Sequence, residues 1–192
     1  MKIYEEIEKQ VKQNKKVIIA IDGPSASGKS TLGDLLEKKY DAVLLHTDNY
    51  FLPVEMKTKE RLAESGGNVD YMRLKSEIMD NLDQEYLKSD YFNCTTNKLE
   101  ERTPIKNKQV VIIEGAYSMH KVLFPYYTLT IFLEIDDTLQ RNRILARNGE
   151  EMLKRWMNEW IPLENMYIKE EKLLDKANIV IDLNIKKYYS LK

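Results

Sequence analysis

Cysteine is almost absent from the chain: Cys94 is the only one among 192 residues. A lone cysteine forms no disulfide within its own chain and gives no basis for a cysteine-rich zinc site. An excess of charge of one sign is absent too, because 30 basic and 31 acidic residues give a formal net charge of −1. Nothing in this balance indicates nucleic acid or an anionic membrane as a partner, so any positively charged site must be local.

Long apolar runs are also lacking. No stretch approaches the roughly 20 apolar residues that span a bilayer, and residues 1–14 alternate charged with apolar side chains, unlike a secretory signal. We therefore expect a cytoplasmic protein. With 43% hydrophobic and 32% charged residues, the chain has the length and composition of one globular domain over residues 1–192.

The most informative motif is a glycine-rich stretch, Gly23-Pro24-Ser25-Ala26-Ser27-Gly28-Lys29-Ser30-Thr31. It reads G-x-x-x-x-G-K-[ST], the P-loop or Walker A pattern of nucleotide-binding proteins. A β-branched apolar run at 16–21 precedes it, and residues 30–40 carry leucines at helical spacing, which is the context that the motif requires. In such a loop, backbone N–H groups and the helix N-terminus bind phosphates. We expect Lys29 on the β- and γ-phosphates and Ser30 on Mg²⁺. The predicted nucleotide-binding residues are Gly23, Ser25, Ala26, Ser27, Gly28, Lys29, Ser30 and Thr31.

Apolar runs and helical patterns alternate along the rest of the chain. Buried strands are predicted at 42–45, 110–115, 129–135 and 178–181, and helices at 3–11, 71–82, 138–148 and 150–176. The last helix is expected to bend or break near Pro162. Residues 54–68 read as a mobile excursion with one short helix, and residues 83–107 as irregular. The alternation predicts an α/β protein with the three-layer P-loop NTPase fold: a parallel five-stranded sheet, helices on both faces and a small lid.

Two carboxylates follow predicted strands. Asp48 comes after the second strand and Glu114 ends the third, and α/β sheets bind ligands beyond the carboxyl ends of their strands. From this position Asp48 can accept a proton from a substrate hydroxyl or hold Mg²⁺, directly or through water. Glu114 is a candidate metal ligand beside Ser30 and Asp48. The structural alternative for each carboxylate is a helix cap or a turn.

Arginines are concentrated in the predicted helix at 138–148. Arg143 and Arg147 lie four residues apart and share a helix face, whereas Arg141 points elsewhere. A phosphoryl-transfer enzyme needs cations over the γ-phosphate, because charge spreads over its oxygens in the transition state. A solvated helix with salt bridges is the structural alternative. Structural roles are favoured for His46, His120, Trp156 and Trp160.

In this order, the motifs resemble the uridine kinase family of P-loop kinases, from the strand before Gly23 to the last strand at 177–181. Residues 47–51 resemble the family segment whose aspartate, here Asp48, is the base for the nucleoside 5′-hydroxyl. Residues 68–71 resemble the segment whose aspartate, here Asp70, holds the ribose hydroxyls. Ile113-Glu114-Gly115 resembles the motif whose glutamate helps to bind Mg²⁺, and the residues around Arg143 and Arg147 resemble the arginine-rich lid.

Part of the family pattern is missing. The segment that reads the nucleobase contains a histidine and an arginine in the family, and neither is present in residues 91–97. Asn148-Gly149 stands where the family has Arg-Asp and a longer lid. The resemblance therefore covers the phosphate-handling half better than the acceptor half. It implies a phosphate loop and base segment at 15–53, an acceptor-binding excursion at 54–107 and an arginine-rich lid at 138–150.

The sequence thus predicts a kinase that uses ATP and Mg²⁺ to phosphorylate a hydroxyl of a small molecule, with the 5′-hydroxyl of a nucleoside implied by the resemblance. The expected catalytic residues are Lys29, Asp48, Arg143 and Arg147, and the expected acceptor-binding residues are Asp48, Tyr50, Asp70, Tyr71, Tyr91 and Phe92. A P-loop kinase for another small alcohol or cofactor precursor stays open as an alternative. So does a nucleotide-dependent regulatory ATPase that acts on a protein partner. The expected partner is a small molecule, without nucleic acid or membrane, and a homo-oligomer is left open.

Overall fold

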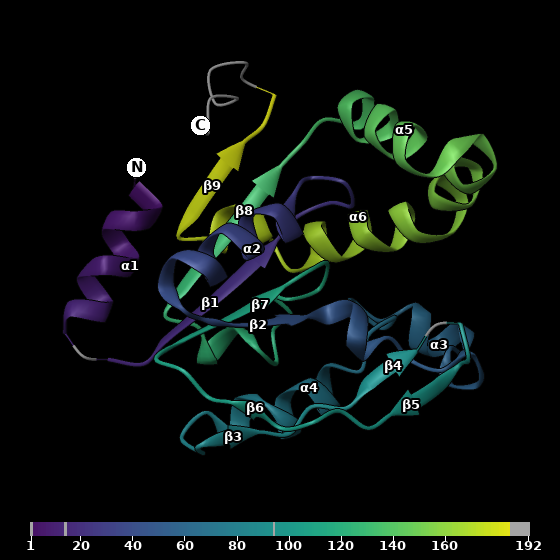
Figure 1. Cartoon of the computed structure of the whole chain (residues 1–192). Coiled ribbons are helices and arrows are strands. Elements are labelled where there is room, and N and C mark those ends of the chain that lie inside the picture. The colour runs from purple at the N-terminus through teal and green to yellow at the C-terminus, as the bar shows by residue number, and fades with distance from the viewer. Residues whose placement is uncertain (1, 14, 94, 185–192) are drawn as a thin grey trace.

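The computed structural model describes residues 2–13, 15–93 and 95–184, so Cys94 lies outside the described part. Within these residues, five parallel strands form the central sheet in the order β2-β7-β1-β8-β9 (Figure 1). The strands are β1 (Val17–Asp22), β2 (Val43–His46), β7 (Val110–Glu114), β8 (Leu129–Glu134) and β9 (Ile179–Asp182). The predicted parallel α/β sheet is confirmed, and the strand order is a feature that hydrophobic periodicity alone did not give.

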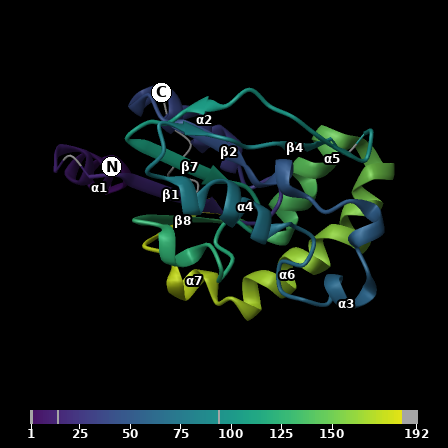
Figure 2. The same ribbon diagram turned by 90° about the horizontal axis from the view of Figure 1, so that it is seen from below.

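Helices cover both faces of this sheet, which is why its central strands are apolar without alternation. Every residue of β1 and of β7 is buried. One face packs against α1 (Lys2–Lys12) and α2 (Lys29–Tyr40), which supply Ile3, Ile7, Leu32 and Leu36 to that side of the core. The other face packs against α4 (Tyr71–Glu77), α6 (Ile161–Glu170) and α7 (Leu173–Lys176), and α6 and α7 lie below the strands in Figure 2.

The excursion between β2 and β7 is more regular than its sequence suggested. It contains the short helices η1 (Thr47–Tyr50), η2 (Val54–Met56), α3 (Lys59–Leu62) and η3 (Met79–Asn81). Residues 83–107, predicted to be irregular, form two antiparallel pairs: β3 (Tyr86–Leu87) with β6 (Ile105–Lys106), and β4 (Tyr91–Asn93) with β5 (Lys98–Glu100). That prediction is wrong because strands of two or three residues are too short to display a two-residue hydrophobic period.

The expected interruption near Pro162 is present. Helix α5 (Asp137–Arg155) ends at Arg155, a π-helical turn, η5 (Trp156–Trp160), follows it, and α6 begins at Ile161. Pro162 lies in the first turn of α6, where its missing N–H group costs little. A further interruption lies inside α5 at Gly149, whose φ of 78° favours glycine.

Two further features complete the fold. The 3-10 helix η4 (Phe124–Tyr126) connects β7 to β8. Among the helices that the structure describes, none is both long and apolar enough to cross a membrane.

Candidate active site

A cavity of about 840 Å³ opens beyond the carboxyl ends of the sheet strands. In Figure 1, the α5–α6 region arches above this end of the sheet, and the 54–107 excursion lies below it. The cavity is lined by eleven residues that the sequence had nominated: Ser25, Ala26, Gly28, Lys29, Ser30, Thr31, Asp48, Phe92, Glu114, Arg143 and Arg147. The phosphate loop, both strand-end carboxylates and both arginines therefore meet in one place.

The phosphate loop has the backbone shape that its glycines permit. Gly23 has a φ of 146°, and a Cβ atom there would lie 2.4 Å from the carbonyl oxygen of Leu133. The Lys29 side chain folds along the loop and donates to the carbonyl oxygens of Gly23, at 2.8 Å, and of Pro24, at 3.0 Å. Helix α2 begins at Lys29 without a side-chain cap from Gly28, which leaves its N-terminus available to an anion.

Asp48 lies in η1, directly after β2, and its exposed side chain lines the cavity. Desolvation by neighbouring protein atoms, together with the nearby charge of Glu114, raises the pKa of the Asp48 carboxyl. The strand register explains why Asp48 lies near Glu114. His46 of β2 pairs with Glu114 of β7, and Asp48 follows His46 by two residues. Two carboxylates at adjacent strand ends create a site that favours protons or cations.

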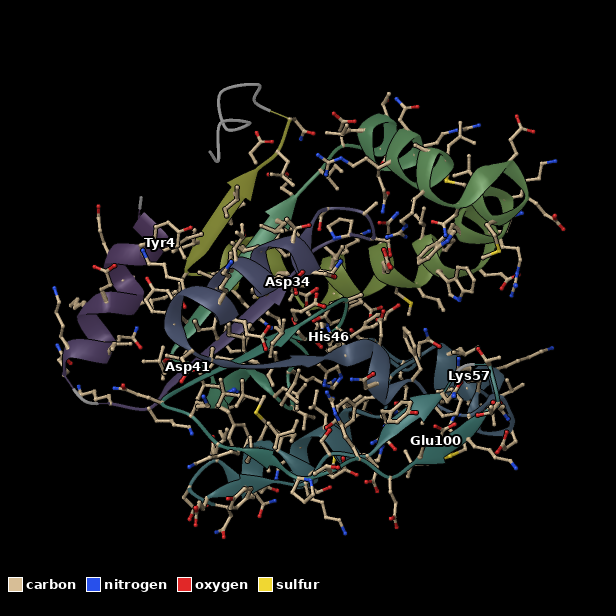
Figure 3. The ribbon with its side chains drawn as sticks, in the orientation of Figure 1. Tyr4, Asp34, Asp41, His46, Lys57 and Glu100 are labelled. Carbon is tan, nitrogen blue, oxygen red and sulfur yellow. The ribbon has the colours of Figure 1, made fainter. Side chains whose placement is uncertain are left out.

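His46 contacts the second carboxylate. Its Nδ1 atom lies 2.5 Å from Oε1 of Glu114, and this hydrogen bond raises the pKa of the imidazole. Figure 3 labels His46 at the end of β2 and Lys57 in the 54–107 excursion. The sequence predicted a structural role for His46 but did not identify Glu114 as its partner. A single sequence does not reveal which residues lie side by side on neighbouring strands. His120 fits its structural interpretation: it is buried and stacks on Tyr71 at 3.9 Å between ring centroids.

The oxygen atoms of Ser30, Asp48 and Glu114 suit Mg²⁺, which prefers hard oxygen ligands and usually keeps waters and substrate phosphates in its shell. Within the described residues, no group of three or more histidine, cysteine, aspartate or glutamate side chains could hold a metal ion by itself. A site made of one hydroxyl and two carboxylates is therefore incomplete without phosphate oxygens. This composition fits a metal that arrives with a nucleotide.

The two predicted arginines reach the cavity from α5 in different ways. Arg143 donates from Nη1 to the carbonyl oxygen of Ala26 at 3.0 Å, so it contacts the phosphate loop itself. Arg147 is exposed, donates to Asn148, and places its guanidinium 5.8 Å from the ring centroid of Trp156. Arg143 is thus held against the loop, whereas Arg147 lies at the rim.

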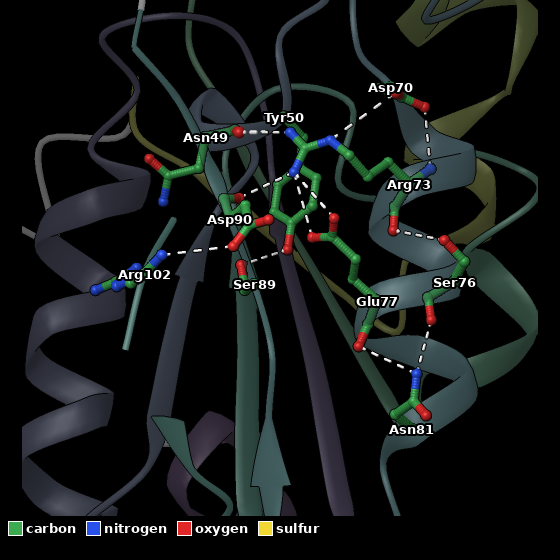
Figure 4. Close-up of polar contacts among 10 residues, drawn as sticks. All are labelled: Asn49, Tyr50, Asp70, Arg73, Ser76, Glu77, Asn81, Ser89, Asp90 and Arg102. Atoms are coloured by element: carbon green, nitrogen blue, oxygen red, sulfur yellow. Dashed lines mark hydrogen bonds and ion pairs between the residues drawn. The ribbon is translucent and has the colours of Figure 1, made fainter. Parts of the chain in front are cut away.

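Four predicted acceptor-binding residues do not line the cavity. The Tyr50 hydroxyl is buried against Ser89 Oγ at 2.6 Å, Tyr71 stacks on His120, and the Tyr91 hydroxyl donates to Glu100. Asp70 caps α4 by accepting from the Arg73 N–H group at 3.0 Å. Figure 4 shows Asp70 within the network around Arg73, whose guanidinium also donates to the carbonyl oxygens of Asn49 and Asp90. Gly23 and Ser27 of the predicted nucleotide set also lie outside the cavity lining.

Sequence reasoning missed several lining residues. Trp156 and Trp160, expected in the core, are half-buried, line the cavity and contact each other with ring centroids 4.6 Å apart. Their four-residue spacing gave the same signal for a core face as for a cavity wall. The remaining lining residues are Phe51, Val54, Lys57, Asn68, Asn97, Gly115, Ala116, Tyr117 and Glu164. Phe51, Asn68 and Gly115 belong to segments that resemble family motifs, but no role was assigned to them, and no motif marked the others.

Known proteins resemble this chain in sequence and in fold. No protein-family profile matches it. The uridine kinase of Mycoplasma pneumoniae is 29% identical over 194 residues, which cover 87% of this chain and 85% of that protein. Among solved structures, a possible uridine kinase from Bacillus stearothermophilus has a TM-score of 0.68 at 18% identity and covers 95% of this chain and 100% of its own. D-glycerate 3-kinase from Cryptococcus neoformans has a TM-score of 0.58 at 15% identity, and the match covers 88% of this chain and 87% of that chain. In sequence, and in its P-loop kinase fold, the chain is therefore similar to uridine kinases.

Proposed function

We propose that this chain transfers the γ-phosphate of ATP to a hydroxyl of a small molecule, and that this hydroxyl is the 5′-hydroxyl of a nucleoside. The single observation that carries the proposal is the meeting of a phosphate loop and a strand-end carboxylate, Asp48, in one cavity. A phosphate loop alone is also found in switches and motors. A carboxylate facing the loop across a cavity adds what a kinase needs, which is a base for an acceptor hydroxyl.

The chemical step assigns a role to each lining group. Asp48 orients the acceptor hydroxyl and takes its proton while the oxygen bonds to the γ-phosphorus and the bond to the ADP oxygen breaks. Its raised pKa moves it toward the range in which a carboxylate accepts protons effectively. Backbone N–H groups of residues 26–30 and the α2 N-terminus hold the phosphates, and Lys29 leaves its two loop carbonyls to neutralise them.

The lid and metal residues complete the charge balance. Ser30 and Glu114, with Asp48 nearby, would hold Mg²⁺, which would supply positive charge that offsets the charge of the phosphates. Arg147, exposed at the rim, is placed to swing over the γ-phosphate, while Arg143 stays on the loop carbonyl of Ala26. Because the transition state is loose, positioning and charge neutralisation supply most of the acceleration.

The acceptor is expected to carry a ring. The cavity lining includes the aromatic residues Phe51, Phe92 and Tyr117 and the buried amide of Asn68. Aromatic walls with a few polar groups suit a small cyclic molecule. Asn68 is better placed than Asp70 to hold acceptor hydroxyls, because Asn68 lines the cavity and the Asp70 carboxylate is engaged in capping α4. The names of the curated relatives support a nucleoside as this acceptor.

A second candidate is a kinase for a different small alcohol. Two observations favour it: Asp70, the ribose ligand implied by resemblance, lies outside the cavity lining, and a glycerate kinase shares the fold. ADP release coupled to a spectroscopic readout, measured across nucleosides, sugars and hydroxy acids, separates the two candidates. Faster ADP release with uridine or cytidine than with any other alcohol supports the nucleoside. ADP release that no acceptor accelerates would contradict both candidates and favour the regulatory ATPase.

A further inference from the structure

Glu164 places a carboxylate against the start of the phosphate loop. It lies on α6, is only 4% exposed, and accepts a hydrogen bond from the Ser25 N–H group at 2.9 Å. Its other oxygen accepts from the Ser25 hydroxyl. Burial raises the pKa of Glu164, and the Lys29 charge opposes that shift. A buried carboxylate is costly unless it is hydrogen-bonded, so its contacts with Ser25 make this position tenable.

The same part of the loop is held from α5. Gln140 donates from Nε2 to the Ser25 carbonyl oxygen at 3.1 Å, and Arg143 donates to the carbonyl oxygen of Ala26. Ser25 therefore has its N–H group, its carbonyl and its hydroxyl all bonded to side chains of two helices that follow it far along the chain. Ala26, the next residue, has a φ of 64°, a left-handed conformation that a non-glycine residue adopts only under external constraint.

Helix α6 also contacts Asp22, the last residue of β1, which directly precedes the phosphate loop. One turn after Glu164, the Tyr167 hydroxyl donates to Oδ2 of Asp22 at 2.7 Å. The second oxygen of Asp22 accepts from the N–H group of Gly23 at 2.7 Å. The helix that follows the π-helical turn thus contacts the loop on both sides of Pro24. Its two contacts fix the loop relative to α6 and not only relative to the sheet.

We propose that Glu164 is a positioning residue for phosphoryl transfer: through Ser25 it holds the start of the phosphate loop in the shape that binds nucleotide. The inference rests on the proposed function. With Ser25 N–H engaged by Glu164, the phosphates are bound by the amides that follow it, from Ala26 onward. Fixed donors need no reorganisation when the phosphates arrive, which is the physical advantage of such a contact. The opposing possibility is that the Glu164 carboxylate repels the phosphates. In that case, removal of the carboxylate in Glu164→Ala would lower the Kd for MgATP.

The test is a double-mutant cycle on the equilibrium binding of MgATP, measured by isothermal titration calorimetry. The variants are Glu164→Ala, Ser25→Ala and the double substitution, with Glu164→Gln as the conservative variant. We expect Glu164→Ala to raise Kd about tenfold, because networks of hydrogen bonds to charged groups couple on this scale. Glu164→Gln keeps one acceptor oxygen and should recover part of the loss. Ser25→Ala should have almost no effect once Glu164 is absent.

Glu170→Ala is the matched control, since Glu170 is an exposed glutamate on the same helix and does not line the cavity. Thermal melting of each variant separates loss of fold from loss of binding. Tighter MgATP binding in Glu164→Ala, additive effects of the two substitutions, or a lowered Tm with unchanged Kd would each overturn the proposal. A wild-type chain that binds MgATP but phosphorylates no acceptor would contradict the proposed function alone, because the cycle needs no acceptor.

Discussion

The two walls of the cavity differ in how their residues are distributed along the sequence. The phosphate wall is a contiguous motif between a fully buried strand and α2, and six of its eight predicted residues line the cavity. The proposed acceptor wall draws on the 54–107 excursion, where three of the four predicted binding residues, Asp70, Tyr71 and Tyr91, lie outside the lining. The first wall follows from local backbone chemistry that any phosphate imposes. The second depends on how short elements fold over one another.

This difference indicates which half of the site carries specificity. Phosphates require inward N–H groups, a lysine and a helix N-terminus, so the first wall varies little with the acceptor. The second wall is fixed by contacts such as those of Arg73, whose guanidinium donates to Asn49 and Asp90 carbonyls at 2.8 and 2.9 Å. Substitutions on the two walls should therefore change different kinetic parameters.

The largest effect is expected where the two walls meet, at Asp48. Asp48→Asn preserves shape and removes the base, so phosphoryl transfer should fall about 10²–10⁴-fold while MgATP binding survives. Steady-state kinetics and calorimetry on the same preparation measure both. Asp175→Asn, an exposed aspartate on α7, is the control. Partial recovery at high Mg²⁺ would make Asp48 a metal ligand, and unchanged activity at every Mg²⁺ concentration would rule out both roles.

Lys29→Met should act on the phosphate wall. The substitution removes a cation that neutralises charge developing on the phosphates, and kcat should drop about 10²–10³-fold with every acceptor alike. Lys38→Met, later on the same helix and exposed, should leave turnover unchanged. Near-normal turnover of a folded Lys29→Met variant, verified by circular dichroism, would contradict the kinase assignment.

Trp160→Ala tests whether the α5–α6 side of the cavity also contributes to acceptor binding. Trp160 faces the cavity from the π-helical turn, and its loss removes an aromatic contact. We expect the KM for the acceptor to rise about tenfold, with the KM for ATP nearly constant, because an aromatic contact is typically worth up to about 1.5 kcal/mol beyond area burial. Met157→Ala, on the same turn but outside the lining, is the control. An equal rise in both KM values would break the separation of the walls.

The smallest effect is expected at Asp70. Asp70→Ala removes the cap of α4, so the free energy of unfolding should decrease by about 1 kcal/mol. Discrimination between a ribonucleoside and its 2′-deoxy analogue should stay as in wild type. Asp136→Ala removes the corresponding cap of α5 and should have a similar cost. Loss of that discrimination in Asp70→Ala alone would restore the ribose-binding role that the family resemblance implies.

The limits of sequence reasoning follow the same division. The central strands could be predicted because each is a continuous apolar run buried on both faces, and the phosphate loop because its chemistry is local in sequence. The role of Glu164 could not be predicted, because its partner Ser25 lies 139 positions away. In a sequence, a single buried glutamate of a helix looks the same as a solvent-exposed one. His46 and Glu114 meet only through strand order, which periodicity does not encode.

The excursion was harder for a further reason. Its strands have two or three residues, so antiparallel pairing and not hydrophobic pattern determines them. Trp156 and Trp160 lie on a π-helical turn and line the cavity, and their four-residue spacing is the same for a cavity wall as for a core face. The family resemblance assigned ribose binding to Asp70 from the order of the motifs alone. In the structure, the Asp70 carboxylate accepts a hydrogen bond from the Arg73 N–H group and caps α4.

The central claim is that phosphate passes directly from ATP to an acceptor hydroxyl in this cavity. The most direct test incubates the protein with MgATP and uridine, and quantifies ADP and phosphorylated uridine in the same samples by chromatography and mass spectrometry. We predict equal amounts of the two products with the wild-type chain, and about 10²–10⁴-fold slower formation of both with Asp48→Asn. ADP that accumulates at the same rate with and without uridine, cytidine or any other small alcohol, and without phosphorylated acceptor, would contradict the account.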